Sequence, residues 1–128
     1  MPARPPALAV CAAVAVVFGL LTIVSGGGAL FAGVDMGAVV PFVLWFNFTA
    51  GFVYIAAGIG LWRGAEWAPA LSLVIAIATS AVLLAFLGHV WNGGPYEART
   101  MGAMSLRLLV WTVIARLAFR SRRRLARR

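Results

Sequence analysis

Four long, mostly apolar runs determine what this chain can fold into. They occupy residues 7–24, 39–62, 68–91 and 95–119, and each is long enough for a transmembrane helix, which needs about 17–25 apolar residues. Only short connections separate the runs. Because a backbone inside lipid must satisfy its own hydrogen bonds, the sequence predicts an all-α membrane protein: a single domain built as a four-helix up-down bundle.

The distribution of charge fits a membrane protein and excludes other classes. Of the 128 residues, 63% are hydrophobic and 11% are charged, whereas a soluble domain carries about 25% charged residues. The net charge of +8 could indicate nucleic-acid binding, but seven of the eleven basic residues lie in the last thirteen positions. A basic tail directly after an apolar helix is typical of a cytoplasmic anchor on anionic lipid. We therefore expect residues 120–128 to form such a tail, and we expect no nucleic acid as a partner.

The arginines also predict the orientation. With four spans, Arg4, Arg63 and the C-terminal arginines lie on one side of the membrane, which the positive-inside rule assigns to the cytoplasm. Both termini are then cytoplasmic, in the inner membrane of a bacterium, and the glycine-rich connection at 25–38, which contains Asp35, faces outward. A cleaved signal peptide is the alternative for the first run, but the apolar core of a signal peptide is usually about 7–15 residues long, and this run is longer.

The most polar stretch is the corner between the third and fourth runs. Pro95 is expected to begin the fourth helix, because proline is favoured in the first helical turn, and Glu97 then lies near the positive end of the helix dipole. Arg99 is expected to point to the other side of that helix, within reach of the interface. His89 closes the third run, and three roles stay open for it: an interfacial hydrogen bond, titration near neutral pH, or ligation of a haem or metal.

Arg107 is the most informative single residue, because it lies inside the fourth apolar run. An arginine there costs on the order of 2.5–3.5 kcal/mol on insertion scales, so we expect it to face the bundle interior and pair with Glu97 or Asp35. Snorkelling to the outer interface is the alternative. The topology brings five polar residues into the outer half of the bundle, and we predict that they form a ligand site: Asn47, His89, Glu97, Thr100 and Arg107.

Catalytic and metal-binding patterns are absent from the sequence. It contains no GxSxG, HExxH or phosphate-loop motif and no paired-carboxylate spacing, which are the patterns that would indicate an enzyme. Cys11 is the single cysteine and His89 the single histidine, whereas zinc needs three or four such ligands. We therefore expect no catalytic residue and no metal site, and the sequence names no cofactor.

Two segments carry a resemblance to a known family. FNFTAGFVY at 46–54, continuing to GIGLW at 58–62, and YEARTMGAM at 96–104, continuing to Arg107, resemble small four-span bacterial inner-membrane proteins that are loosely similar to DoxX-like proteins. The resemblance implies the four-helix architecture and brings no catalytic residue. Small multidrug transporters share the size and span count, but they carry a glutamate in the first helix, and residues 7–24 contain none.

The leading functional expectation is a non-enzymatic membrane protein. It is either an accessory subunit, in a homo-oligomer or a larger membrane complex, or a binder of a lipid, quinone or other small hydrophobic molecule in a polar pocket of the outer leaflet. Arg107 would hold an anionic or carbonyl group there, with Glu97 as its resting counter-ion and His89 able to titrate. A small oligomeric proton-coupled transporter is the first alternative, and a redox-associated membrane subunit is the second.

Overall fold

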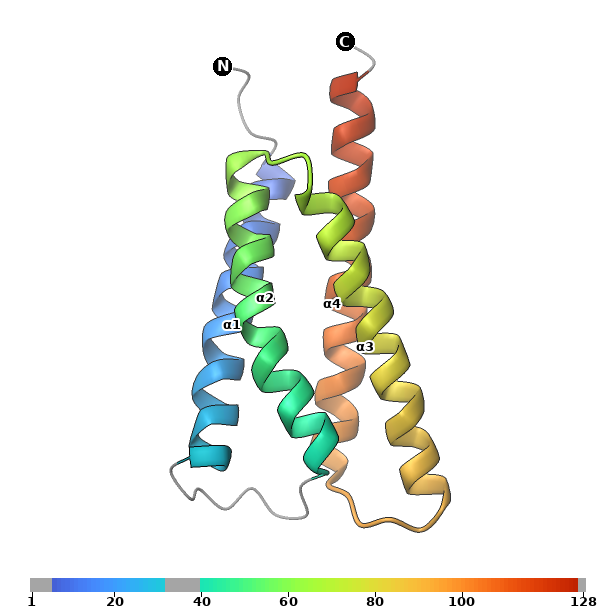
Figure 1. Cartoon of the computed structure of the whole chain (residues 1–128). Coiled ribbons are helices and arrows are strands. Elements are labelled where there is room, and N and C mark those ends of the chain that lie inside the picture. Colours follow the sequence, from blue (N-terminus) through green and yellow to red (C-terminus); the bar gives the residue numbers. More distant parts are fainter. Residues whose placement is uncertain (1–5, 32–39, 127–128) are drawn as a thin grey trace.

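The computed structural model describes residues 6–31 and 40–126, with side chains up to residue 121. This part of the chain forms four helices (Figure 1): α1 (Pro6–Phe31), α2 (Pro41–Arg63), α3 (Ala68–Trp91) and α4 (Ala98–Ala126). Each contains a segment that is long and apolar enough to cross a membrane. The helices alternate in direction, so the predicted up-down helical bundle is confirmed, and the chain is a multi-pass membrane protein.

The bundle has two distinct ends, which are named here by the chain segments they hold. The terminal end contains the start of α1, the α2–α3 turn and the end of α4. The loop end contains the end of α1, the start of α2, and the corner between α3 and α4 (Figure 1). Arg4, which was used to predict the orientation, and Asp35, a predicted partner of Arg107, lie outside the described residues.

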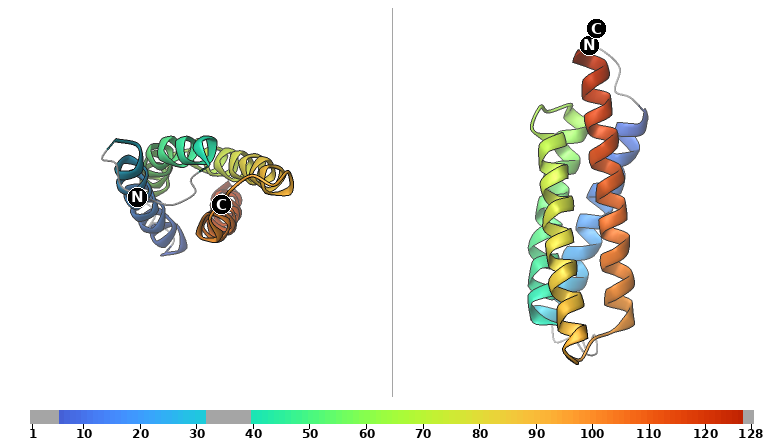
Figure 2. Two further views of the ribbon diagram at one scale, coloured as in Figure 1. Left: turned by 90° about the horizontal axis from the view of Figure 1, so that it is seen from below. Right: turned by 90° about the vertical axis from the view of Figure 1, so that its right-hand side faces the viewer.

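The four helices follow one another around an arc rather than closing into a square (Figure 2, left). α1 packs mainly against α2, and α3 packs mainly against α4, whereas α1 and α4 contact each other much less. The α1–α2 contact depends on glycine. A Cβ added to Gly19 would lie 2.7 Å from the carbonyl oxygen of Gly51, and one added to Gly58 would lie 3.0 Å from the carbonyl oxygen of Ala12. Small residues of this kind let membrane helices approach closely.

The first helix is longer than the sequence indicated. We predicted that the first span ends at residue 24 and that a glycine-rich loop follows, but α1 continues through Ser25 and the three glycines to Phe31. Two contacts with α2 hold this last part of the helix: Gly26 is buried against Phe48, and the Phe31 ring packs edge-on against the rings of Trp45 and Phe48. Helical hydrogen bonding also satisfies the backbone of these residues, which outweighs the low helix propensity of glycine.

The fourth helix begins later than predicted. Pro95 does not start α4, and Glu97 is not in its first turn; the helix begins at Ala98. The carbonyl of Glu97 instead accepts the first helical bonds, from the N–H groups of Thr100 and Met101 at 3.0 and 3.4 Å. Residues 94–97 stay non-helical because two side chains of α3 hold them: His89 bonds to the Pro95 carbonyl at 2.9 Å, and the ring of Phe86 packs edge-on against Tyr96.

The terminal half of the bundle is filled by small and apolar side chains. Its buried cluster includes Ala12, Ala15, Ala57, Leu61, Ile75, Ala76 and Ile114. Ser72, which is fully buried, bonds back to the carbonyl of Ala68 at 2.9 Å, as expected of hydroxyls in membrane helices. The buried cluster of this half therefore supplies packing.

Candidate functional site

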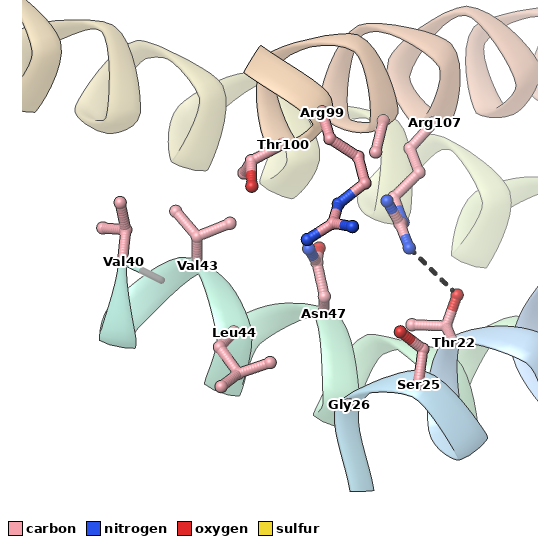
Figure 3. Close-up of a pocket in the computed structure, with 11 residues that line it drawn as sticks. Thr22, Ser25, Gly26, Val40, Val43, Leu44, Asn47, Arg99, Thr100 and Arg107 are labelled. Atoms are coloured by element: carbon pink, nitrogen blue, oxygen red, sulfur yellow. Dashed lines mark hydrogen bonds between the residues drawn. The ribbon is translucent and has the colours of Figure 1, made fainter. Parts of the chain in front are cut away.

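A polar cavity of about 160 Å³ lies at the loop end between α1, α2 and α4 (Figure 3). Six polar residues line it: Thr22, Ser25, Asn47, Arg99, Thr100 and Arg107. Apolar side chains of α2 and α4, among them Val40, Val43, Leu44 and Ala103, complete the wall. Since a water molecule takes up about 30 Å³ in the liquid, the space is large enough for the polar group of an amphiphile or for several waters.

Arg107 crosses this space from α4 to α1. It lies nine residues after the start of α4, which is roughly 13 Å along the helix axis at the α-helical rise. Its Nη2 donates to the hydroxyl of Thr22 at 3.2 Å (Figure 3), and Thr22 itself is only 4% exposed. The Arg107 Nε is buried without a hydrogen-bond partner. The predicted interior-facing position of Arg107 is therefore confirmed, because its side chain points across the bundle to α1.

The partner of Arg107 in the cavity is a hydroxyl, where the sequence predicted a carboxylate. Of the two acids proposed for this role, Asp35 lies outside the described residues, and Glu97 does not line the cavity. The wall of the cavity contains no acidic side chain among the described residues. A hydroxyl can accept a hydrogen bond from a guanidinium but cannot balance its charge, so the bond to Thr22 leaves the charge of Arg107 unneutralised.

Arg99 also belongs to the cavity, which corrects its predicted position on the other side of α4. Its guanidinium extends over the space and ends beside the side chain of Asn47 (Figure 3). The sequence did contain the necessary signal, because Arg99, Ala103 and Arg107 are spaced four residues apart and therefore share one helix face. Thr22 and Ser25 were missed for another reason: Thr22 lies in an apolar run, and Ser25 was assigned to a loop.

Asn47 and Thr100, two further predicted site residues, are brought to the cavity with Arg107. Asn47 lies in the second turn of α2, and its Oδ1 is buried without a hydrogen-bond partner. Buried amide oxygens are normally bonded, so this atom can accept a hydrogen bond from a group that enters the cavity. Three of the five predicted residues thus form one site.

His89 and Glu97, the other two, do not line the cavity. His89 sits in the last turn of α3, where the backbone closes a Schellman motif: the N–H of Gly94 bonds to the His89 carbonyl at 2.9 Å, and Gly93 takes a φ of 80°. The His89 ring lies against Gly94 and bonds through Nε2 to the Pro95 carbonyl. Of the three roles left open for this residue, the structure shows the hydrogen bond.

The described residues hold no group of three or more His, Cys, Asp and Glu side chains that could bind a metal ion. The cavity is instead a set of hydrogen-bond donors around two guanidinium groups, with one amide and three hydroxyls. Guanidinium groups bind carboxylates and phosphates through charge-assisted, often bidentate hydrogen bonds. The chemistry of the wall therefore matches an anionic or strongly polarised carbonyl group.

Comparison with protein-family models, with curated proteins and with solved structures finds no match to this chain. The resemblance to DoxX-like proteins accordingly stays an expectation. What the molecule does has to be inferred from the cavity itself.

Proposed function

We propose that this membrane protein is a non-enzymatic binder of an amphiphilic molecule, such as a lipid or quinone, whose anionic or carbonyl group sits in the loop-end cavity. The observation that carries the proposal is Arg107: a charged side chain roughly 13 Å inside a membrane helix, facing a cavity, with its Nε buried and unpartnered. Arginines inside membrane helices are costly and mark binding or transport sites. Thr22 positions the guanidinium, and Arg99, Asn47 and Thr100 supply the other polar contacts.

The position of the cavity supports an amphiphile rather than a water-soluble ion. Val40, Val43 and Leu44 form an apolar part of its wall beside the two arginines. The cavity also lies between α1 and α4, the neighbours that contact each other least. A molecule with an apolar tail and a polar head could therefore approach from the bilayer and place its head between the guanidinium groups, as binding pockets with apolar walls and few polar groups do.

Glu97 and His89, the two predicted site residues outside the cavity wall, have other roles in this proposal. Glu97 is the acidic residue described at the loop end, and we retain it as a resting counter-ion for the positive charge of this end. His89 is engaged with the Pro95 carbonyl, so we assign it to the architecture of the corner and not to ligand contact.

Orientation and location are further parts of the proposal. The loop end would face outward and the termini the cytoplasm of a bacterium, because Arg63, Arg116 and Arg120 lie toward the terminal end together with the C-terminal arginine tail. That tail would contact anionic lipid of the cytoplasmic leaflet. A second copy of the chain or a larger complex is the expected partner if the protein acts as an accessory subunit.

Native mass spectrometry after purification in a mild detergent tests the proposal. We expect wild-type protein to carry a lipid or quinone species that Arg107→Met loses. Arg120→Met, an exposed arginine of the same helix, is the matched control and should keep the species. Arg99→Met and Thr100→Val provide second tests if Arg107→Met does not fold. Identical bound species and occupancy in wild type and all cavity variants would disprove the proposal.

A further inference from the structure

A second group of polar atoms lies deeper in the bundle than the cavity, near the middle of the membrane. It is formed by Tyr54 of α2, Thr79 of α3, and Trp111 of α4, together with the inner side of Arg107, and is called the inner polar site. The Tyr54 hydroxyl, Thr79 Oγ1, Trp111 Nε1 and Arg107 Nε are all buried without a hydrogen-bond partner. Tyr54, Thr79 and Trp111 have no exposed surface at all.

These four groups converge from three helices. The rings of Tyr54 and Trp111 are in contact, with centroids 4.8 Å apart and planes tilted by 41°. The Tyr54 hydroxyl lies within electrostatic reach of Thr79 and Arg107, yet it makes no hydrogen bond of good geometry with either. Tyr54, Thr79 and Arg107 are therefore close enough to share one small partner, and the Trp111 ring packs against this group through Tyr54.

Buried polar groups that find no partner in the protein are unfavourable. In a membrane interior, every polar group needs a partner, because lipid supplies none, and buried polar groups in proteins are nearly always bonded to protein or to water. The Tyr54 hydroxyl, Thr79 and Arg107 lie close enough together to supply the two to four polar partners that a bound water needs, and the Trp111 ring lies beside Tyr54. Arg107 Nε and Trp111 Nε1 can only donate, so a partner of either atom has to accept.

The inner polar site and the cavity share one residue, Arg107. Its Nη2 bonds to Thr22 in the cavity wall, and its guanidinium also lies within reach of the Tyr54 hydroxyl. One to two helical turns nearer the terminal end, the same helices bury apolar side chains: Ala57, Leu61, Ile75, Ala76 and Ile114. This set is called the apolar plug.

We propose that water enters from the loop-end cavity, passes Arg107 and occupies the inner polar site, so that the bundle contains a hydrated half-channel that stops at the apolar plug. The water accepts hydrogen bonds from Arg107 and Trp111 and exchanges them with Tyr54 and Thr79. The half-channel explains how the chain carries an arginine inside a membrane helix, because the charge stays hydrated from one face. It does not require the amphiphile, which would bind in the outer part of the same space.

Hydroxyl-radical footprinting in lipid nanodiscs tests the water directly, because radicals generated from bound water modify the side chains beside it. Tyr54 and Trp111 should be modified severalfold faster than Phe86 and Met104, which are equally buried but pack in a cluster of apolar side chains only. Tyr96, an exposed loop residue, reports the full rate. If Tyr54 and Trp111 are as unreactive as Phe86 while Tyr96 is modified, the inner polar site is dry and the proposal is wrong.

Cysteine accessibility tests the one-sidedness of the path. In a Cys11→Ala background, Thr79→Cys should react with the anionic reagent methanethiosulfonate ethylsulfonate when it is added at the loop-end face of reconstituted vesicles. Ser72→Cys, two turns nearer the terminal end on the same helix and fully buried, is the matched control and should stay unlabelled. Equal labelling of both variants, or labelling of Thr79→Cys only from the terminal face, would overturn the half-channel. Because neither measurement uses a lipid or quinone, a failed ligand proposal leaves both results interpretable.

Discussion

The two faces of α1 meet their neighbours in opposite ways. Toward α2, α1 presents glycine: a Cβ on Gly19 would lie 2.6 Å from Cγ1 of Ile55 and 2.7 Å from the Gly51 carbonyl oxygen. Toward α4, only one turn away, it presents Thr22, which accepts one hydrogen bond from Arg107 across an open cavity. The first interface is close and apolar, and the second is loose and charged.

The difference separates stability from function within one small bundle. Membrane helices associate through close packing of small residues, since lipid tails offer no hydrophobic driving force, and the α1–α2 interface meets that requirement. A cavity beside an intramembrane arginine lowers the stability of the bundle, because packing contacts are lost and a charge is kept inside the membrane. We therefore expect substitutions at the first interface to unfold the protein, and substitutions at the second to remove ligand while leaving the fold intact.

The largest effect is expected from Gly19→Ala. The added methyl would overlap the backbone of α2, which cannot rotate away, so α1 and α2 have to separate at a cost of about 1–3 kcal/mol. Gly88→Ala is the matched control, because Gly88 is also helical, in the last turn of α3, but has nothing within 4 Å of its added Cβ. There the same change should stabilise the helix by about 0.5–1 kcal/mol. Unfolding in mixed micelles measures both variants.

Equal effects of the two alanine substitutions would contradict this account of the bundle. They would mean that the α1–α2 contact does not depend on the close backbone approach at Gly19, and that the first interface is no tighter than the rest. The contrast with the cavity would then lose its physical basis.

The second prediction concerns Arg107→Met, measured on protein stripped of bound lipid. The long apolar side chain should fill part of the cavity and remove the cost of a buried charge, so the protein gains about 1 kcal/mol of stability. Thr22 loses a donor but can bond back to the carbonyl one turn earlier on α1, as threonines in helices do. Arg120→Met, on the exposed surface, should change the unfolding free energy by less than about 0.5 kcal/mol.

A clear destabilisation by Arg107→Met would mean that Arg107 stabilises the fold, as the glycines of the α1–α2 interface do. The arginine would then act as interhelical glue through Thr22, and the proposed trade of stability for binding, which is common at functional sites, would not hold here. A double-mutant cycle with Thr22→Val would measure the interaction free energy of the Arg107–Thr22 hydrogen bond, which is typically about 1 kcal/mol.

The sequence predicted the bundle because hydrophobic length is a local property. Four apolar runs identify four spans without any knowledge of contacts, and the interior position of Arg107 followed from its energetic cost alone. The same local reasoning failed for the glycines after Ser25, which form part of α1. Their helix is held by contact with Phe48 on α2, and such tertiary contacts are invisible in a single segment.

The candidate site was only partly predictable for a related reason. Topology places His89, Glu97 and Arg107 at the same end of the bundle, but whether side chains converge depends on helix rotation. The rotation of α4 turns Arg99 and Arg107 into the cavity. His89 instead bonds to the Pro95 carbonyl in the α3–α4 corner. The sequence of the corner does not indicate which of its polar side chains bond to the local backbone and which line the cavity.

The smallest effect is expected from His89→Ala, and it separates the corner from the cavity. The lost bond to the Pro95 carbonyl is at an exposed position, so we expect a cost of about 0.5 kcal/mol, the low end for a single hydrogen bond. The species bound by wild-type protein should remain at full occupancy, because His89 does not line the cavity. His89→Gln, which can still donate to the carbonyl, should recover most of the lost stability. If His89→Ala stays folded and yet loses the bound species, the ligand reaches the α3–α4 corner, and the site includes the histidine that the sequence first placed in it.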